Sequence, residues 1–301
     1  MKRNRPRLSR RTFWVLCALL VCLRLALTGF QQAYIWVGGA PLDDELMFRA
    51  ANSITAGQWL GAYDYLTLSK AMFFPVWLAL LHALHLPYLI SGAALWCGAA
   101  LTAAFAFSPL WRKKDTEQGR VLTLALFAVL AFLPSSWASY TLRVYRDNIF
   151  PALCLYFFAG MAGMALRAVQ EKPAPLWPWL AAAGAGLACG YLDREDAGLF
   201  LLPFAAAATG IVAVVLVGKR RWRALAAQLI PYLMLGAGVL TFCTLNYTHY
   251  GVFALSDFSE GSFAAAMGAM MRVDTDSDKP YLSAPADARA KIYAAVPELE
   301  P

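Results

Sequence analysis

Long apolar runs alternate with short polar stretches along this chain, and their spacing predicts its elements. A helix needs about 20 mostly apolar residues to cross ~30 Å of hydrocarbon, because unpaired backbone groups cannot be left in lipid. Seven runs meet this criterion, at approximately 12–37, 88–111, 120–139, 148–166, 177–192, 197–217 and 224–245. The pattern therefore predicts an all-α fold, a polytopic transmembrane helical bundle of about seven spans.

An eighth apolar run, 71–86, is the contested segment. A helix over this run rises only about 24 Å, and the run contains Pro75 and two histidines. If it does not span, the stretches 1–11, 112–120, 167–176 and 218–223 are cytoplasmic and hold 16 of the 26 basic residues. If it spans, every later basic cluster moves outside, against the retention of Lys and Arg on the cytoplasmic side. We therefore expect 71–86 to be a juxtamembrane or re-entrant helix.

This threading divides the chain into two regions. Residues 1–245 form a transmembrane module with a cytoplasmic N-terminus and an outer loop, 38–87, that carries juxtamembrane helices. Residues 246–301 are polar, without a further span, and we expect an extracytoplasmic tail with a short helix around Asp287 to Ala295. Because the tail stops in mid-pattern, we expect the chain to be an N-terminal fragment of a longer protein whose soluble region is truncated.

Composition narrows the class of protein. A chain with 60% hydrophobic and 15% charged residues is not a soluble enzyme. The six cysteines lie inside apolar runs without CxxC or Cys/His spacing, which disfavours disulfide scaffolds and zinc sites. The net charge of +7 comes from basic residues in short clusters between apolar runs. This is the arrangement typical of topology signals. We therefore expect membrane lipid as a partner and no nucleic acid.

The first span carries a single charge, Arg24. Its basic start and apolar stretch are also typical of a cleaved signal peptide, but the stretch is longer than a signal sequence needs and contains this arginine. Arg24 has two interpretations: a charge buried against a neighbouring helix, or a contact for an anionic lipid.

Three clusters of ionisable residues face the outer side in this topology, and Lys70 precedes the short helix. The clusters are Asp43-Asp44-Glu45 after the first span, Arg143, Arg146 and Asp147 between the third and fourth, and Asp193-Arg194-Glu195-Asp196 between the fifth and sixth. Each alone has a structural explanation: Asp43 can cap a helix over 44–56, and Arg194 can neutralise its neighbours. The apolar spacing after the first cluster predicts an amphipathic helix on the membrane surface.

Together the clusters favour group transfer from a phosphate-bearing lipid. A carboxylate can act as the general base for an acceptor hydroxyl or amine, and Lys or Arg can stabilise charge on a departing phosphate. Charges from three loops over a helical bundle indicate a surface-level active site more than a transport path.

The order of these motifs resembles the GT-C glycosyltransferases, especially the bacterial aminoarabinose transferase of lipid A and the protein O-mannosyltransferases. The matching segments, within roughly 1–245, are Leu42-Asp43-Asp44-Glu45-Leu46 with Arg49-Ala50-Ala51 and Gly57-Gln58-Trp59, then Ser69 to Pro75, and Tyr140 to Ile149. The Arg194-Glu195-Asp196 turn is similar to an Arg-Glu-Glu turn in bacterial members.

The resemblance implies a glycosyltransferase of the bacterial inner membrane that uses a polyprenyl-phosphate-linked sugar donor and a lipid, glycan or protein acceptor at the outer face. It implies Asp44 as the base, with Asp43 one residue away as the alternative. The further candidates are Glu45 and Asp147 for catalysis, and Lys70, Arg143, Arg146, Arg194 and Glu195 for substrate binding. Oxygens of Asp43, Asp44, Glu45 and Asp147 can hold a divalent cation, but the transferases that the chain resembles require no such cofactor.

Two other functions fit the same sequence. A transporter or flippase for a lipid-linked substrate would favour ionisable residues at mid-membrane and broken helices. A non-catalytic membrane assembly subunit would tolerate replacement of the acidic residues.

Overall fold

The computed structural model describes residues 8–36, 38, 41–111, 116–171, 174–258, 261–277, 282 and 284–300. Over these residues the regular elements are helices, and the β-structure consists of a single bridge between Tyr34 and Arg143. The expected all-α fold is therefore confirmed. Part of the basic clusters (1–7, 112–115 and 172–173) lies outside the described residues.

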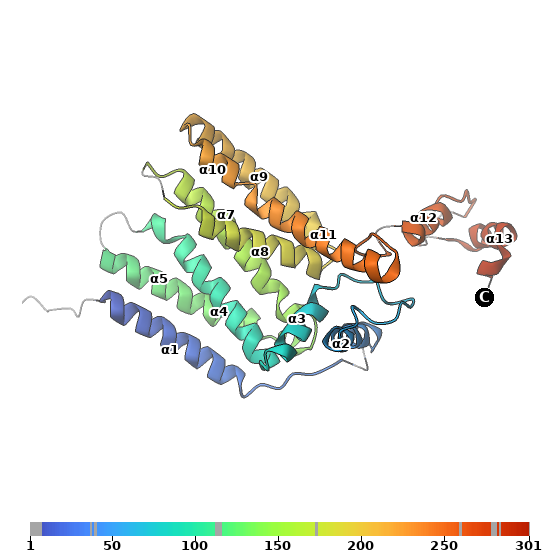
Figure 1. Cartoon of the computed structure of the whole chain (residues 1–301), viewed down its shortest axis with the longest axis horizontal. Coiled ribbons are helices and arrows are strands. Elements are labelled where there is room, and N and C mark those ends of the chain that lie inside the picture. The colour runs from blue at the N-terminus through green and yellow to red at the C-terminus, as the bar shows by residue number, and fades with distance from the viewer. Residues whose placement is uncertain are drawn as a thin grey trace, which may run out of the picture.

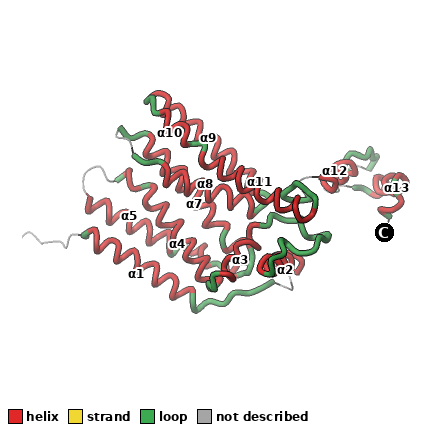
Figure 2. Tube along the Cα trace, viewed as in Figure 1, coloured by secondary structure: helices red, strands yellow, loops and turns green. Residues whose placement is uncertain are grey.

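The helices follow one another along the whole described chain (Figures 1 and 2). They are α1 (Arg10–Thr28), α2 (Pro41–Thr55), α3 (Phe73–Ala83), α4 (Tyr88–Ala106), α5 (Thr116–Ala131), α6 (Ser139–Leu142), α7 (Phe150–Ala168), α8 (Trp177–Asp193), α9 (Ala197–Gly218), α10 (Trp222–Ala227), α11 (Ile230–Tyr250), α12 (Gly261–Met270) and α13 (Ala286–Ala295). Short 3-10 turns lie at Ser108–Leu110, Pro134–Trp137, Arg146–Asn148 and Pro297–Leu299.

Five helical segments of the described chain are long and apolar enough to cross a membrane. They are Arg10–Thr28, Tyr88–Leu110, Phe150–Ala168, Ala197–Gly218 and Trp222–Tyr250. The expected spans 120–139 and 177–192 correspond to α5 and α8, which have 16 and 17 residues and rise only about 24 to 26 Å. The structure thus shows a helical protein with five candidate spans, and the expected number of about seven is not confirmed.

Two expected spans end earlier than their apolar runs. The run 12–37 is helical only to Thr28, and the chain then extends to Tyr34, which pairs with Arg143. The run 120–139 is helical to Ala131, because Pro134 forces the preceding residue into an extended conformation. In both segments the structure has loop backbone where a membrane span was expected.

The long helices form a row, in which α1 packs against α4 and α5, α4 against α7, α7 against α8, and α8 against α11 (Figure 1). Glycines allow the closest approach, between α7 and α8. A Cβ atom on Gly160 would lie 2.4 Å from the Ala183 backbone nitrogen, and one on Gly186 would lie 2.5 Å from the Phe157 nitrogen. Such small residues are typical of tightly packed helices in membranes.

The two ends of the row differ in chemistry. At the basic end, Arg120 Nε donates to the Leu8 carbonyl at 2.8 Å, and Lys219 Nζ donates to the Val169 carbonyl at 2.6 Å. At the opposite end, which we call the loop end, lie the loops that carry the acidic clusters.

The segment between α1 and α4 starts and finishes at the same end of the row of helices, the loop end. Arg24, near the C-terminus of α1, donates to the Ser136 carbonyl, and Tyr88, at the N-terminus of α4, donates to the Arg143 carbonyl. Both flanks of the segment therefore contact the same loop. Its helix α3 has only 11 residues and is not among the five candidate spans, which is compatible with the expectation that 71–86 does not span.

The expected boundary at residue 245 falls inside α11, which ends at Tyr250 and is capped by Gly251 with a positive φ of 72°. The helix expected around Asp287 to Ala295 is confirmed as α13. Helices α12 and α13 stand beyond the loop end, away from the row (Figures 1 and 2).

Candidate active site

Helix α2 carries the acidic triplet and is held by its apolar face. Leu46, Met47 and Ala50 are buried together with Phe74 of α3 and Ile149, as the amphipathic spacing predicted. Because α2 begins at Pro41, Asp43 and Asp44 lie in its first turn, where the helix dipole favours negative charge. The expectation that Asp43 caps a helix starting at residue 44 is therefore wrong.

Asp44 forms a buried ion pair with Arg143. Its carboxylate is 2% exposed, and Oδ1 accepts from Arg143 Nε at 2.9 Å and from Nη2. Oδ2 accepts from the Trp36 backbone N–H at 2.6 Å. Burial alone lowers the pKa of Arg143, but the hydrogen bond and charge of Asp44 outweigh burial and raise it. This pair ties the loop after α1 and the loop after α6 to α2.

Asp43 faces the opposite way, into the solvent-accessible part of the loop end. Its side chain is 34% exposed and lies 3.3 Å from Lys70 Nζ. The Tyr145 hydroxyl donates to Asp43 Oδ2 at 3.2 Å. The structure thus places an accessible carboxylate beside an accessible ammonium group.

Tyr145 links the first acidic cluster to the third, a connection that sequence reasoning missed. Its hydroxyl accepts from Arg146 Nη2 at 2.9 Å, while Arg146 Nη1 donates to Glu195 at 2.9 Å. Glu195 also accepts the Ala71 backbone N–H at 2.6 Å. Burial raises the pKa of Tyr145, with Arg146 opposing this. The only sequence signal for Tyr145 was its place beside Arg146 in the second loop.

Arg194 forms a more exposed bridge between the second and third loops. Its Nη1 donates to Asp147 Oδ1 at 3.2 Å and its Nε to Asp196 Oδ1 at 3.1 Å. The three clusters that the sequence singled out are therefore brought together, through the pairs Asp44–Arg143, Arg146–Glu195 and Asp147–Arg194.

A cavity of about 370 Å³ opens between these loops. Its lining consists of Leu42, Asp43, Leu46, Leu66, Ser69, Lys70, Glu195 and Phe258. The volume lies within the range of small-molecule sites, and the lining combines apolar walls with a few polar groups, as such sites do. Asp43, Lys70 and Glu195 are its charged groups.

Glu45 is not part of this arrangement. It is exposed, and none of the ion pairs within the described part of the chain includes it. The structure does not bring together Asp43, Asp44, Glu45 and Asp147 as metal ligands. Among the described residues, no group of three or more His, Cys, Asp or Glu side chains can hold a metal ion.

Asp193 is a buried carboxyl that the sequence analysis placed in the third cluster without giving it a role. It is the last residue of α8, just past the expected span, and is fully buried with neither carboxylate oxygen hydrogen-bonded. Its backbone carbonyl accepts from Arg146 Nη1 at 3.0 Å, so Asp193 contributes to the position of that arginine.

The chain matches no known protein family, no curated protein and no solved structure. Function is therefore argued from the geometry of the loop end and from the motif order of the sequence.

Proposed function

We propose that this chain is a membrane glycosyltransferase of the GT-C type. It moves a sugar from a polyprenyl-phosphate-linked donor to a lipid, glycan or protein acceptor at the outer face of a bacterial inner membrane. The observation that carries the proposal is the meeting of Asp43 and Lys70 in one cavity over a row of apolar helices. Group transfer from a phosphate needs a base and a cation close together.

In this proposal Asp43 is the general base, although the resemblance gives that place to Asp44. The exposed carboxylate of Asp43 can receive a proton, whereas the lone pairs of Asp44 are taken by Arg143 and Trp36. The acceptor oxygen or nitrogen attacks the sugar C1, and its proton passes to Asp43. The bond between C1 and the phosphate oxygen breaks, and its electron pair leaves with the polyprenyl phosphate.

Lys70 stabilises the charge on that phosphate. Its side chain is 31% exposed and lines the cavity, so it is free to exchange Asp43 for a phosphate oxygen. Glu195 holds the Ala71 N–H next to Lys70 and is itself held by the buried Arg146. Arg146 and Glu195 are thus positioning residues for Lys70, and Asp147 positions Arg194.

The distribution of buried charge favours this chemistry over transport. Within the described chain, the buried charged side chains are Arg24, Asp44, Arg143, Arg146 and Asp193. Arg143 and Arg146 lie in the loop before α7, Asp44 lies in the first turn of α2, and Arg24 and Asp193 lie near the C-terminal ends of α1 and α8. All five are therefore at the loop end. A transport path would need such groups at the middle of the helices.

We further propose that α5 and α8 cross the membrane with the five candidate spans, which gives seven. Helix α5 packs beside α1 and α4, and α8 packs between α7 and α11, so both lie at the depth of longer apolar helices. The basic end then faces the cytoplasm, together with the N-terminus, and the C-terminal tail lies outside.

The test is the binding of undecaprenyl phosphate to the purified full-length protein in detergent. We expect Lys70→Ala to weaken binding by about tenfold or more, because it removes the phosphate contact. Expression and melting should stay near those of the wild type, since an exposed ion pair stabilises by about 1 kcal/mol or less.

Arg49→Ala is the matched control, because Arg49 is an exposed cation of the same loop end, paired with Asp64 at 2.7 Å and outside the cavity lining. Equal affinity in wild type and Lys70→Ala would remove Lys70 from the site and overturn the proposal.

A further inference from the structure

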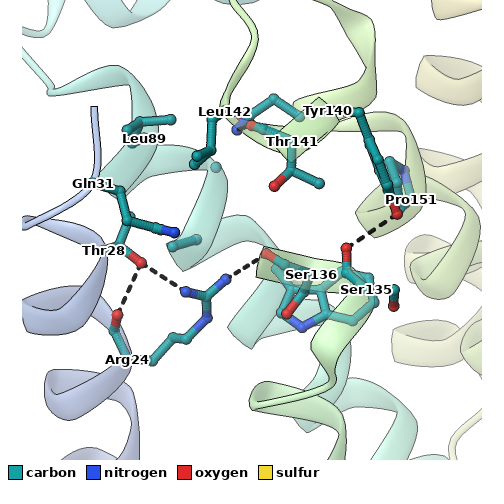
Figure 3. A pocket seen from close by; sticks show the side chains of 14 residues that line it. Arg24, Thr28, Gln31, Leu89, Ser135, Ser136, Tyr140, Thr141, Leu142 and Pro151 are labelled. Carbon is teal, nitrogen blue, oxygen red and sulfur yellow. Dashed lines mark hydrogen bonds between the residues drawn. The ribbon is translucent and has the colours of Figure 1, made fainter. Parts of the chain in front are cut away.

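A second pocket lies at the loop end, between α1, α4, α6 and the first turn of α7 (Figure 3). Its polar lining includes Arg24, Thr28, Gln31, Ser135, Tyr140 and Asn148. It shares no lining residue with the cavity of Asp43 and Lys70. The cavity volume is about 50 Å³, which is room for a few waters or one small polar group. A sugar is too large for it.

Arg24 brings an uncompensated positive charge to this pocket. The residue is 3% exposed, its Nη1 donates to Thr28 Oγ1 and its Nη2 to the Ser136 carbonyl, both at 2.8 Å (Figure 3). The guanidinium stacks over the Trp137 ring at 3.5 Å. Its buried Nε has no hydrogen-bond partner, and within the described residues no carboxylate forms a salt bridge with it. A buried charge is ordinarily paired, and the described chain supplies no carboxylate to this one.

Asn148 adds an unused acceptor to the same pocket. Its Nδ2 donates to the Thr141 carbonyl at 2.7 Å, which fixes the orientation of the amide. Its buried Oδ1 has no partner. Gly92 makes room for the amide, because a Cβ atom there would lie 2.1 Å from Asn148 Oδ1. The residues that line the pocket therefore include a guanidinium N–H and an amide oxygen that make no hydrogen bond within the described chain.

We propose that this pocket binds a phosphate group carried by an anionic membrane lipid. Arginine pairs with phosphate through parallel N–H donors, and an intramembrane charge without a partner points to a ligand. The remaining amide oxygen of Asn148 accepts from a hydroxyl of the headgroup. Exposed Leu23 and Leu27 of α1, with exposed Phe30 just after the helix, provide an apolar surface for the acyl chains. The inference does not depend on the proposed transferase activity.

The experiment counts lipids bound to the purified full-length protein by native mass spectrometry, with phosphatidylglycerol titrated against phosphatidylcholine. We expect a preference for phosphatidylglycerol and a fall of about tenfold or more in its affinity in Arg24→Gln, because the charge that pairs with phosphate is lost. Arg24→Lys should keep part of the affinity. Arg167→Gln is the matched control, because Arg167 also stacks on a tryptophan, Trp179 at 3.8 Å, but lies at the basic end and outside this pocket.

A second variant covers the case in which Arg24→Gln does not fold. Gln31→Glu, on a half-buried rim residue, changes no shape but places a negative charge where the phosphate would sit, so affinity should again fall by about tenfold. Gln170→Glu, at the basic end, should have no effect. Competition by inorganic phosphate would show that free phosphate also occupies the pocket, and its absence would assign the site to lipid alone. Equal binding of phosphatidylglycerol to wild type, Arg24→Gln and Gln31→Glu, or no preference over phosphatidylcholine, would overturn the proposal.

Discussion

Two neighbouring aspartates, Asp43 and Asp44, should respond in opposite ways to the same substitution by asparagine. Asp44→Asn leaves Arg143 charged and 8% exposed without its counter-charge. Removing one partner of a buried pair destabilises by about 3 to 5 kcal/mol. Asp43→Asn removes only a half-exposed contact with Lys70, for which about 1 kcal/mol or less is expected.

Activity should follow the reverse order once protein amount is corrected for. If Asp43 is the base, its amide removes basicity at nearly constant shape, and transfer falls by about 10²–10⁴-fold, equivalent to about 3 to 5 kcal/mol of barrier. Folded Asp44→Asn protein should retain a larger share of activity, because its carboxylate is bonded away from the cavity.

The assay combines thermal melting in detergent with transfer of labelled sugar from a panel of polyprenyl-phosphate donors to membrane acceptors. Expression is measured in parallel for each variant. Full transfer by Asp43→Asn refutes its role as base. A wild-type melting temperature for Asp44→Asn, together with loss of transfer, would move the base to Asp44 and refute the reasoning from burial.

Two further predictions concern stability. Asp193 is buried with neither carboxylate oxygen hydrogen-bonded, and an amide costs less to bury without a partner than a carboxylate does, so Asp193→Asn should melt above the wild-type temperature. A lower melting temperature for Asp193→Asn would contradict this. Gly160→Ala should destabilise the protein by about 1 to 3 kcal/mol, because its Cβ would lie 2.4 Å from the Ala183 backbone. Gly210→Ala in α9, whose Cβ would meet nothing within 4 Å, should melt at or above the wild-type temperature. Equal melting temperatures of the two variants would disprove the close-packing argument.

Much of the fold followed from local pattern. The hydrophobic period predicted the apolar face of α2. The length of the run 71–86 and the basic clusters predicted a short helix there, and the structure shows the 11-residue α3. Span ends were less predictable, because an apolar composition continues past the residues where Pro134 or the pairing of Tyr34 with Arg143 ends helical geometry. An apolar side chain gives the same hydropathy signal in the sequence whether it lies in a loop or in a helix.

The site was predictable as a set of clusters, but not in its internal contacts. Arg143, Arg146, Arg194 and Glu195 were selected from their loops, and the structure joins those loops. Tyr145 was missed and Asp193 was given no role, because both depend on burial and on contacts with residues distant in sequence. Such information is not contained in the spacing of charges along one loop.

The choice between Asp43 and Asp44 depends on where α2 begins. Successive residues of a helix point about 100° apart, so in a helix that includes both, one carboxylate can be buried while its neighbour stays accessible. With the first turn starting at Pro41, Asp44 turns inward to Arg143 and Asp43 turns to Lys70 and the cavity. The buried pair then fixes the helix that presents the exposed carboxylate. If Asp43 is the base, as proposed, stability and chemistry are divided between two adjacent residues, and an Asp-Asp pair suits this position better than one aspartate.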